Sequence, residues 1–351
     1  MRSPEDADAS SPGSDRSGAT ARGDGVAGRG VLAALGPYVA IARPDHWFKN
    51  VFMALGVVLA YFYQLNHPEL PFRHGLLQVA WGLMAVCLVA SSNYVINEIL
   101  DAPTDGNHPV KRHRPVPAGR VDLRVAYGEW LLLAVLGLGM AAALNWPFFF
   151  SALALWGMGL VYNVPPLRAK EVPYVDVLSE SVNNPLRLML GWFAVTASQV
   201  PPVSLTISYW MIGAFFMASK RFAEYRSIAE PATAGAYRSS FRHYDEGRLI
   251  QSMFFYATAS ALFLGVFIIR YHLELILGIP LVAGFFSYYM RVTLKPDSPA
   301  QSPERLYRER GLMVYLVVCV AALLLLMFVR IDLLYEVFNV PSPEVPTLWR
   351  I

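Results

Sequence analysis

The sequence has few charged residues and few cysteines. Only 16% of its 351 residues are Asp, Glu, Lys or Arg, whereas 55% are hydrophobic. The net charge is only +3, and no basic run is interleaved with aromatic residues, so we expect no nucleic-acid partner. Cys87 and Cys319 both lie in apolar stretches, which favours a packing role over a redox or metal role.

The first thirty residues lack any aliphatic cluster. Residues 1–30 are rich in Ser, Gly, Ala, Asp and Arg, so they cannot bury enough apolar surface to offset the entropy of ordering. They also lack the continuous apolar segment of a secretory signal peptide. We therefore expect a disordered cytoplasmic tail over 1–30, a transmembrane domain over 31–335 and a short C-terminal tail over 336–351.

Long apolar stretches recur through the rest of the chain. Apolar runs of about 20 residues are typical of helices that cross a bilayer. The sequence therefore predicts an all-α polytopic membrane protein, a bundle of about nine transmembrane helices. The candidate spans are residues 48–65, 76–99, 125–144, 146–163, 174–197, 203–219, 252–269, 273–290 and 312–330.

The basic residues are distributed unevenly between the loops. The connections after the second, fourth, sixth and eighth candidate spans are rich in Lys and Arg, whereas the opposite loops contain only Arg73 and Arg270. Basic loops stay in the cytoplasm by the positive-inside rule. We therefore expect an inner (plasma) membrane protein whose N-terminus and polar loops face the cytoplasm.

The second candidate span is followed by the polar stretch NEILDAPTDGNHPVKRHRP. Asn97, Asp101 and Asp105 recur every four residues, so they share one face of a continuing helix. Oxygen ligands of this kind suit Mg²⁺, which binds one or two carboxylates together with phosphate oxygens. A solvated helix end is the alternative, but acids at a helix C-terminus are unfavourable without a cation. Pro103 predicts that the helix ends or bends near it, which would leave Asp105 in the following loop.

Basic residues follow the acidic ones. Lys111 and Arg114 lie in a short proline-flanked loop that returns towards the acids, where they could hold phosphate charge and stabilise a departing pyrophosphate. Lys49, before the first span, is either an interfacial anchor beside Trp47 or a contact for the phosphate of a lipid substrate.

Two later stretches add charges near the membrane. Asp176, Glu180 and Arg187 lie within the fifth candidate span, where ionisable groups usually mark a site or a pathway. A structural salt bridge among the three is the alternative. Lys220 and Arg221 end the sixth span, and we interpret them as further phosphate contacts.

The stretch NEILDAPTDGNHPVKRHRPVPAG resembles the first aspartate-rich motif of the UbiA superfamily of intramembrane prenyltransferases, NDxxDxxxD followed by a basic loop ending in RP. The stretches RPDHWFKN and SKRFAEYR resemble the decaprenyl-phosphate phosphoribosyltransferase branch. The resemblance covers about residues 40 to 330 and implies a UbiA-like transferase domain over 31–335.

Each motif position carries an expected role. The resemblance implies catalytic roles for Asp101, Asp105 and Lys111, with Arg114 as a phosphate contact. Glu98 stands where an aspartate is usual, and its longer side chain is expected to reach the metal through water. The implied Mg²⁺ ligands are Asn97, Glu98, Asp101 and Asp105. The implied substrate contacts are Lys49, Arg114, Asp176, Glu180, Arg187, Lys220 and Arg221.

Three functions remain open from the sequence. The favoured one is Mg²⁺-dependent transfer of a phosphoribosyl group from phosphoribosyl pyrophosphate to a polyprenyl phosphate. The second is prenyl transfer from a polyprenyl diphosphate to an aromatic or other small acceptor. Asp176 and Glu180 leave this choice open, because prenyl-transferring members carry a second aspartate-rich motif. The third, an ion-coupled transporter, would need neither the acidic motif nor its basic loop. The expected partners are a polyprenyl lipid, a phosphorylated donor and membrane lipids.

Overall fold

The computed structural model describes residues 35–64, 72–106, 111–228, 239–301 and 303–341. Within these residues the regular structure is entirely helical, which confirms the all-α fold. The predicted tail at 1–30 and the last ten residues of the chain lie outside the described residues.

Eleven α-helices and several short 3₁₀ segments follow one another among the described residues. The α-helices are α2 (Met53–Gln64), α3 (Phe72–Asp105), α4 (Leu123–Leu144), α5 (Trp146–Asn163), α6 (Val175–Ser181), α7 (Asn183–Phe193), α8 (Val203–Ser227), α10 (Glu246–Tyr271), α11 (Ile279–Thr293), α12 (Arg310–Phe328) and α13 (Asp332–Val337). The 3₁₀ segments are η1 (Pro44–Phe52), η2 (Lys111–His113), η3 (Ala169–Glu171), η4 (Ser239–Arg242), η5 (Leu273–Gly278), η6 (Pro299–Gln301) and η7 (Pro303–Arg308).

Five helical segments of the described chain are long and apolar enough to cross a membrane. They are Gly75–Asp105, Leu123–Leu144, Glu246–Tyr271, Leu273–Thr293 and Arg310–Phe328. Helices also occupy the other four candidate spans, but they do not meet the same length and composition, so the count of nine remains a prediction. The fifth candidate span is interrupted at Val182, between α6 and α7.

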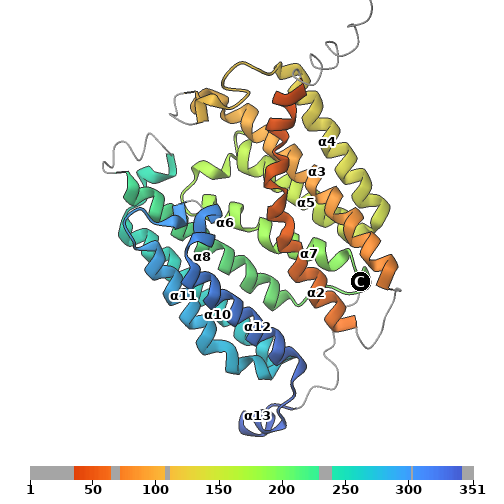
Figure 1. Ribbon diagram of the computed structural model, residues 1–351, viewed down its shortest axis with the longest axis vertical. Coiled ribbons are helices and arrows are strands. Elements are labelled where there is room, and N and C mark those ends of the chain that lie inside the picture. The colour runs from red at the N-terminus through yellow and green to blue at the C-terminus, as the bar shows by residue number, and fades with distance from the viewer. Residues whose placement is uncertain (1–34, 65–71, 107–110, 229–238, 302, 342–351) are drawn as a thin grey trace, which may run out of the picture.

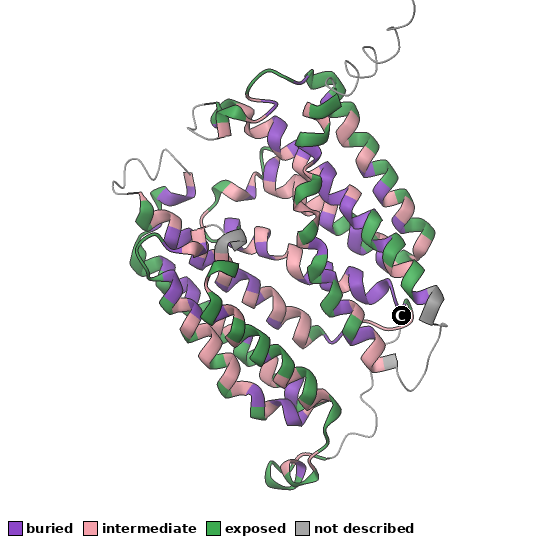
Figure 2. Cartoon of the chain, in the orientation of Figure 1, coloured by how far each residue is buried: buried purple, intermediate pink, exposed green. Residues whose placement is uncertain are grey.

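The helices form two groups (Figure 1). In one group, α3, α4 and α5 pack together, and α7 packs against both α5 and α2; in the other, α8 packs against α10, and α6 lies against α8. The outward faces of α4 and α12 are exposed and apolar, as Leu131, Val135, Val317 and Leu325 illustrate (Figure 2). A bilayer would accept these faces, because its hydrocarbon core is as apolar as they are.

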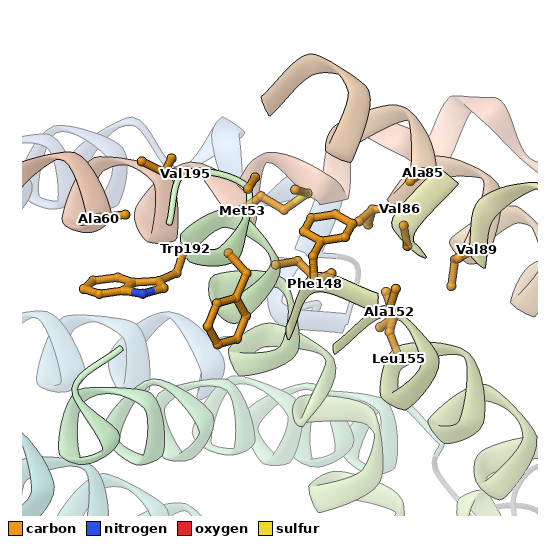
Figure 3. Packing of buried hydrophobic residues seen from close by; sticks show 14 of the residues in the cluster. Met53, Ala60, Ala85, Val86, Val89, Phe148, Ala152, Leu155, Trp192 and Val195 are labelled. Atoms are coloured by element: carbon orange, nitrogen blue, oxygen red, sulfur yellow. The ribbon is translucent and has the colours of Figure 1, made fainter. Parts of the chain in front are cut away.

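The first group has a tightly packed core around Phe148 and Trp192 (Figure 3). Helices α2 and α7 approach closely there because each presents a glycine. A Cβ atom added to Gly56 would lie 1.9 Å from the carbonyl oxygen of Leu188, and one added to Gly191 would lie 2.0 Å from that of Met53. Since η1 leads directly into α2, this close approach also brings η1 against α7.

Helix α3 is longer than a membrane requires. Its 34 residues span about 50 Å, whereas a bilayer hydrocarbon core measures about 30 Å. Apolar residues dominate the helix from Leu76 to Ile96, and the polar motif begins at Asn97. The last turns of α3 therefore project the motif beyond the apolar part of the bundle.

Candidate active site

The end of α3 carries the predicted metal-binding side chains. The helix continues to Asp105, and the amide of Gly106 donates to the carbonyl oxygen of Ala102. The expectation that Asp105 lies in a loop is therefore wrong. Pro103 lacks the N–H group that would donate to the carbonyl oxygen of Ile99, but it stands in the last turn, so only two helical residues follow the bend that a proline can introduce. Asn97, Asp101 and Asp105 consequently share one helical face.

The structure brings the predicted basic loop back to Asp105. The Nη1 atom of Arg114 lies 2.6 Å from Asp105 Oδ2, and the Nζ atom of Lys111 lies 3.6 Å from Oδ1. Asp105 is 5% exposed, whereas both basic side chains reach the surface in part. The cations can therefore exchange this carboxylate for another anion without leaving their places.

Asp101 is held by residues from the segment that follows α5. Lys170 donates to Asp101 Oδ1, and Arg168 Nη2 lies 3.4 Å from the same atom. Asn163 accepts from Lys170 at 2.9 Å and from Asn97 at 2.5 Å. Burial lowers the pKa of Lys170 from its ordinary value, while the adjoining Asp101 carboxylate opposes that shift.

Sequence reasoning treated Arg168 and Lys170 as orientation charges and did not consider Asn163. Arg168 and Lys170 stand 67 and 69 residues after Asp101, so no spacing rule could bring them together. A signal did exist: Asn163 is a polar residue that ends an apolar helix, and two cations follow it within seven residues. We call the whole group the α3 cluster. It consists of Asn97, Asp101, Asp105, Lys111, Arg114, Asn163, Arg168 and Lys170.

The α3 cluster suits a magnesium ion by the chemistry of its donors. No three His, Cys, Asp or Glu side chains gather as a metal site anywhere in the described part of the chain. Mg²⁺ does not need three, because one or two carboxylates suffice when phosphate oxygens and waters complete the octahedron. Asp101 and Asp105 supply the carboxylates, and the amide oxygens of Asn97 and Asn163 are further hard donors.

Glu98 does not belong to this group of donors. Its side chain is 1% exposed; one oxygen accepts from Arg43 at 3.3 Å, and the other accepts the amide N–H of Val116 at 3.2 Å. The structure therefore gives no support to Glu98 as a metal ligand, and that role stays a prediction. Its carboxylate instead links both the segment before α2 and the loop after α3 to helix α3.

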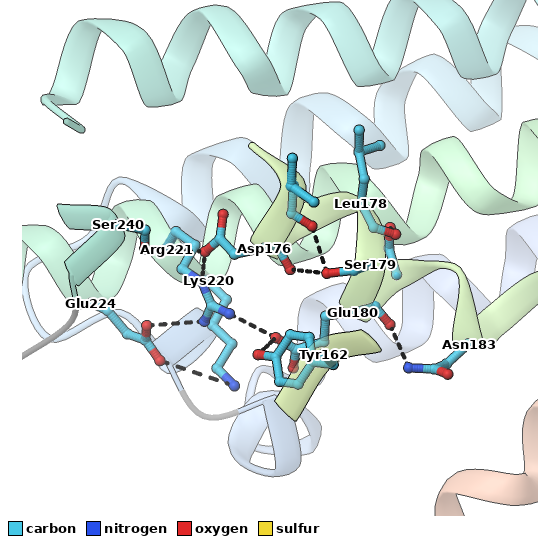
Figure 4. A network of polar contacts seen from close by, with 12 residues as sticks. Tyr162, Asp176, Leu178, Ser179, Glu180, Asn183, Lys220, Arg221, Glu224 and Ser240 are labelled. Carbon is cyan, nitrogen blue, oxygen red and sulfur yellow. Dashed lines mark hydrogen bonds and ion pairs between the residues drawn. The ribbon is translucent and has the colours of Figure 1, made fainter. Parts of the chain in front are cut away.

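A second group of charges lies between α6 and α8, around Arg221 (Figure 4). The guanidinium of Arg221 lies 3.0 Å from Asp176, 2.6 Å from Glu180 and 3.2 Å from Glu224. Asp176 also accepts from the hydroxyl group of Tyr244 at 2.7 Å. We call Asp176, Glu180, Arg221 and Glu224 the Arg221 cluster.

The central residues of the Arg221 cluster are too deeply buried to contact a substrate. The side chains of Arg221 and Asp176 are both 0% exposed. The structure therefore gives no support to Arg221 as a phosphate contact, because its charge is enclosed and already balanced by carboxylates. Lys220 lies at the edge of this group, 4.0 Å from Glu224. Arg187 forms no ion pair with Asp176 or Glu180, so the alternative interpretation, a structural salt bridge among these three residues, is not what the structure shows.

Lys49 lies on η1, and η1 packs against α7. It is partly buried, and its charge together with burial lowers the pKa of the nearby His46 from 6.5. His46 is therefore largely neutral at pH 7. Trp47, two residues before Lys49, donates to Ser91 of α3 at 2.9 Å, so η1 is held against the middle of α3.

Residues 50–316, about three quarters of the chain, match the UbiA prenyltransferase family. The chain belongs to the UbiA prenyltransferase family. Helical architecture and the acidic motif at the end of α3 agree with that membership. The protein is therefore a UbiA-type intramembrane transferase that crosses the membrane several times.

Individual UbiA relatives are more distant. The chain is 29% identical over 217 residues to the decaprenyl-phosphate phosphoribosyltransferase of Corynebacterium glutamicum, covering 58% of each chain. It is 29% identical over 207 residues to the enzyme of that name from Mycobacterium tuberculosis, covering 59% of this chain and 65% of the relative. The match thus spans less than two thirds of the length of both relatives.

A solved structure shares the fold. A UbiA homologue from Archaeoglobus fulgidus bound to GPP and Mg²⁺ superposes with a TM-score of 0.61 at 19% identity, covering 84% of this chain and 100% of that one. This likeness supports the all-helical UbiA fold.

Proposed function

We propose that this protein is a Mg²⁺-dependent transferase that moves a phosphoribosyl group from phosphoribosyl pyrophosphate to a polyprenyl phosphate. The observation that carries the proposal is the charge of the α3 cluster, in which four cations surround two carboxylates, although one of the cations, Arg168, also pairs with Glu171 at 2.5 Å. An excess of cations around hard oxygen ligands is the arrangement that a pyrophosphate group needs. The names of the two phosphoribosyltransferase relatives point to the same donor.

The proposed exchange of partners follows from these contacts. A Mg²⁺ ion held by Asp101 and Asp105 would neutralise pyrophosphate oxygens and stabilise the leaving group. Once those carboxylates are engaged, Lys111, Arg114 and Lys170 lose their counter-charges and can turn to the phosphate oxygens of the donor.

The chemistry needs no protein nucleophile. An oxygen atom of the lipid phosphate attacks the anomeric carbon of the ribose, and the bond from that carbon to the pyrophosphate oxygen breaks. Pyrophosphate departs with the electron pair, so the charges balance without a proton transfer. The lipid phosphate is already ionised at neutral pH, so the contribution of the protein is to position the two substrates and to stabilise the departing charge.

The basic loops that carry the α3 cluster lead us to infer that it faces the cytoplasm of the inner (plasma) membrane. Soluble phosphoribosyl pyrophosphate would reach the cluster from that side. The polyprenyl chain would extend sideways into the bilayer.

Prenyl transfer from a prenyl diphosphate to a small acceptor is the second candidate. It is favoured by the fold shared with the Archaeoglobus fulgidus homologue, which was solved with GPP and Mg²⁺. Both candidate donors carry a diphosphate, so the α3 cluster by itself suits either of them.

Substrate-profiled turnover separates the two functions. The purified protein in nanodiscs, supplied with Mg²⁺, labelled phosphoribosyl pyrophosphate and polyprenyl phosphate, should form labelled lipid and release pyrophosphate. The same preparation with a prenyl diphosphate and a phenolic acceptor should form no product. Product in the second assay and none in the first would overturn the proposal.

A further inference from the structure

Arg187 of α7 is a buried cation with neutral neighbours. It is 9% exposed, and its Nε atom donates to Asn50 Oδ1 at 3.0 Å while Nη1 donates to the carbonyl oxygen of Asn183 at 3.2 Å. The other groups with which it interacts electrostatically are Tyr94, Tyr209 and Cys87. None of these five partners carries a negative charge at neutral pH.

No carboxylate among the residues that the structure describes forms an ion pair with Arg187. A buried guanidinium without an anion is costly, and in membrane proteins such a charge usually serves a ligand. Arg221 shows that the same bundle can neutralise a buried arginine fully when its role is structural. The missing counter-charge at Arg187 therefore points to an anion that arrives from outside the chain.

The position of Arg187 relates this anion to the α3 cluster. Tyr94 interacts electrostatically with both Arg187 and Arg43, and it stands on α3 seven residues before Asp101. Seven residues of helix rise about 10 Å. Arg187 therefore lies beside the part of α3 that is about two turns before Asp101.

We propose that Arg187 binds the phosphate group of the lipid acceptor, and so selects a prenyl monophosphate over the uncharged prenyl alcohol. This inference rests on the proposed function, because it assigns an acceptor to the same reaction. It replaces Arg221, whose charge is already balanced, as the guanidinium that holds the lipid. Asn50 and Asn183 fix the guanidinium in place with neutral oxygens, which leave its positive charge available to the phosphate.

A substitution at Asn50 separates anion binding from a purely structural role. Asn50→Asp keeps Arg187 and its hydrogen bond but adds the missing carboxylate. Protein stability should be retained or rise, because the buried cation gains an ion pair. Affinity for the lipid phosphate should fall, because the new carboxylate both neutralises Arg187 and repels the phosphate.

Binding is measured without Mg²⁺ or donor, in nanodiscs, with a short-chain prenyl monophosphate and the matching prenyl alcohol as probes. Wild-type protein should prefer the monophosphate. Arg187→Gln and Asn50→Asp should each weaken monophosphate binding by ~100-fold and leave alcohol binding unchanged. Arg187→Lys should keep part of the preference, and Arg270→Gln, which removes an exposed arginine from the last turn of α10, should keep all of it.

The outcomes distinguish this inference from the proposed function. Monophosphate binding that persists in a folded Asn50→Asp protein overturns the role of Arg187, even if phosphoribosyl transfer is observed. Binding that depends on Arg187, in a protein that forms no phosphoribosyl product, supports the anion site and overturns the donor. If Arg187→Gln does not fold, the Asn50→Asp result alone decides.

Discussion

The protein neutralises its two acidic groups in opposite ways. In the α3 cluster, two carboxylates face four cations, and several of these cations are partly exposed. In the Arg221 cluster, three carboxylates surround one fully buried guanidinium. The first arrangement can exchange protein partners for a metal and a phosphorylated substrate, whereas the second can lose a partner only by burying an unbalanced charge. The role of an acidic residue near a membrane can therefore be assigned only when its neighbours in the folded structure are known.

The largest expected effect contrasts Asp101 with Asp176. Asp101→Asn should lower turnover by about a thousandfold or more, because it removes a proposed metal ligand, and should change stability little. Asp176→Asn should instead lower the thermal midpoint of unfolding, because it weakens the buried contacts of Arg221. Turnover and thermal unfolding of both variants test the contrast, and an active Asp101→Asn protein would contradict it.

Arg221 should matter for stability rather than for substrate binding. Arg221→Met should cost about 3–5 kcal/mol of unfolding free energy, because buried carboxylates lose their counter-charge. The matched control is Arg226→Met, whose pair with Glu246 is largely exposed and should contribute less than about 1 kcal/mol. Chemical unfolding in detergent measures both values. Equal losses in the two variants would show that the Arg221 cluster is not structural.

Lys170 should behave as an exchangeable cation of the α3 cluster. Lys170→Gln should weaken competitive inhibition by pyrophosphate by ~10- to 100-fold, because a charge-assisted hydrogen bond to phosphate is lost. Lys295→Gln, which removes a lysine paired with Glu309 elsewhere in the chain, should leave inhibition unchanged. If inhibition is unaltered in Lys170→Gln, Lys170 does not contact pyrophosphate and only binds Asp101.

The smallest expected effect on catalysis is at Glu98. Glu98→Gln should cost about 1–3 kcal/mol of stability, because a buried acceptor of Arg43 loses its charge. The Mg²⁺ concentration needed for half-maximal activity should stay within about twofold of the wild-type value, since Glu98 does not face the proposed metal site. A tenfold rise in that concentration would indicate that Glu98 is a metal ligand.

Much of the fold could be predicted from the sequence. Apolar runs of bilayer length determine helices because a chain in lipid must satisfy its backbone hydrogen bonds internally. The interruption of the fifth span at Val182 and the continuation of α3 past Pro103 could not be predicted. Both depend on whether neighbouring helices tolerate one missing or distorted hydrogen bond.

The same distinction between local and long-range contacts applies to the candidate site. Asn97, Asp101 and Asp105 were recognisable because they recur on one helical face, and Lys111 and Arg114 because they follow within the next loop. Their proximity to Asp105 agrees with that reading. Lys170, which pairs with Asp101, and the two carboxylates Asp176 and Glu180, which pair with Arg221, come from segments more than forty residues away, so only a folded chain can select them.

The sequence by itself determined the all-helical membrane fold and the acidic motif at the end of its second long apolar stretch, because both follow from local periodicity. The tertiary structure decided which charges are balanced within the protein. Arg187 and Arg221 look alike in the sequence, as single cations in or beside apolar helices. Packing gives Arg221 three carboxylates and gives Arg187 two neutral oxygens, and a buried charge acquires its role from what lies within a few ångströms of it.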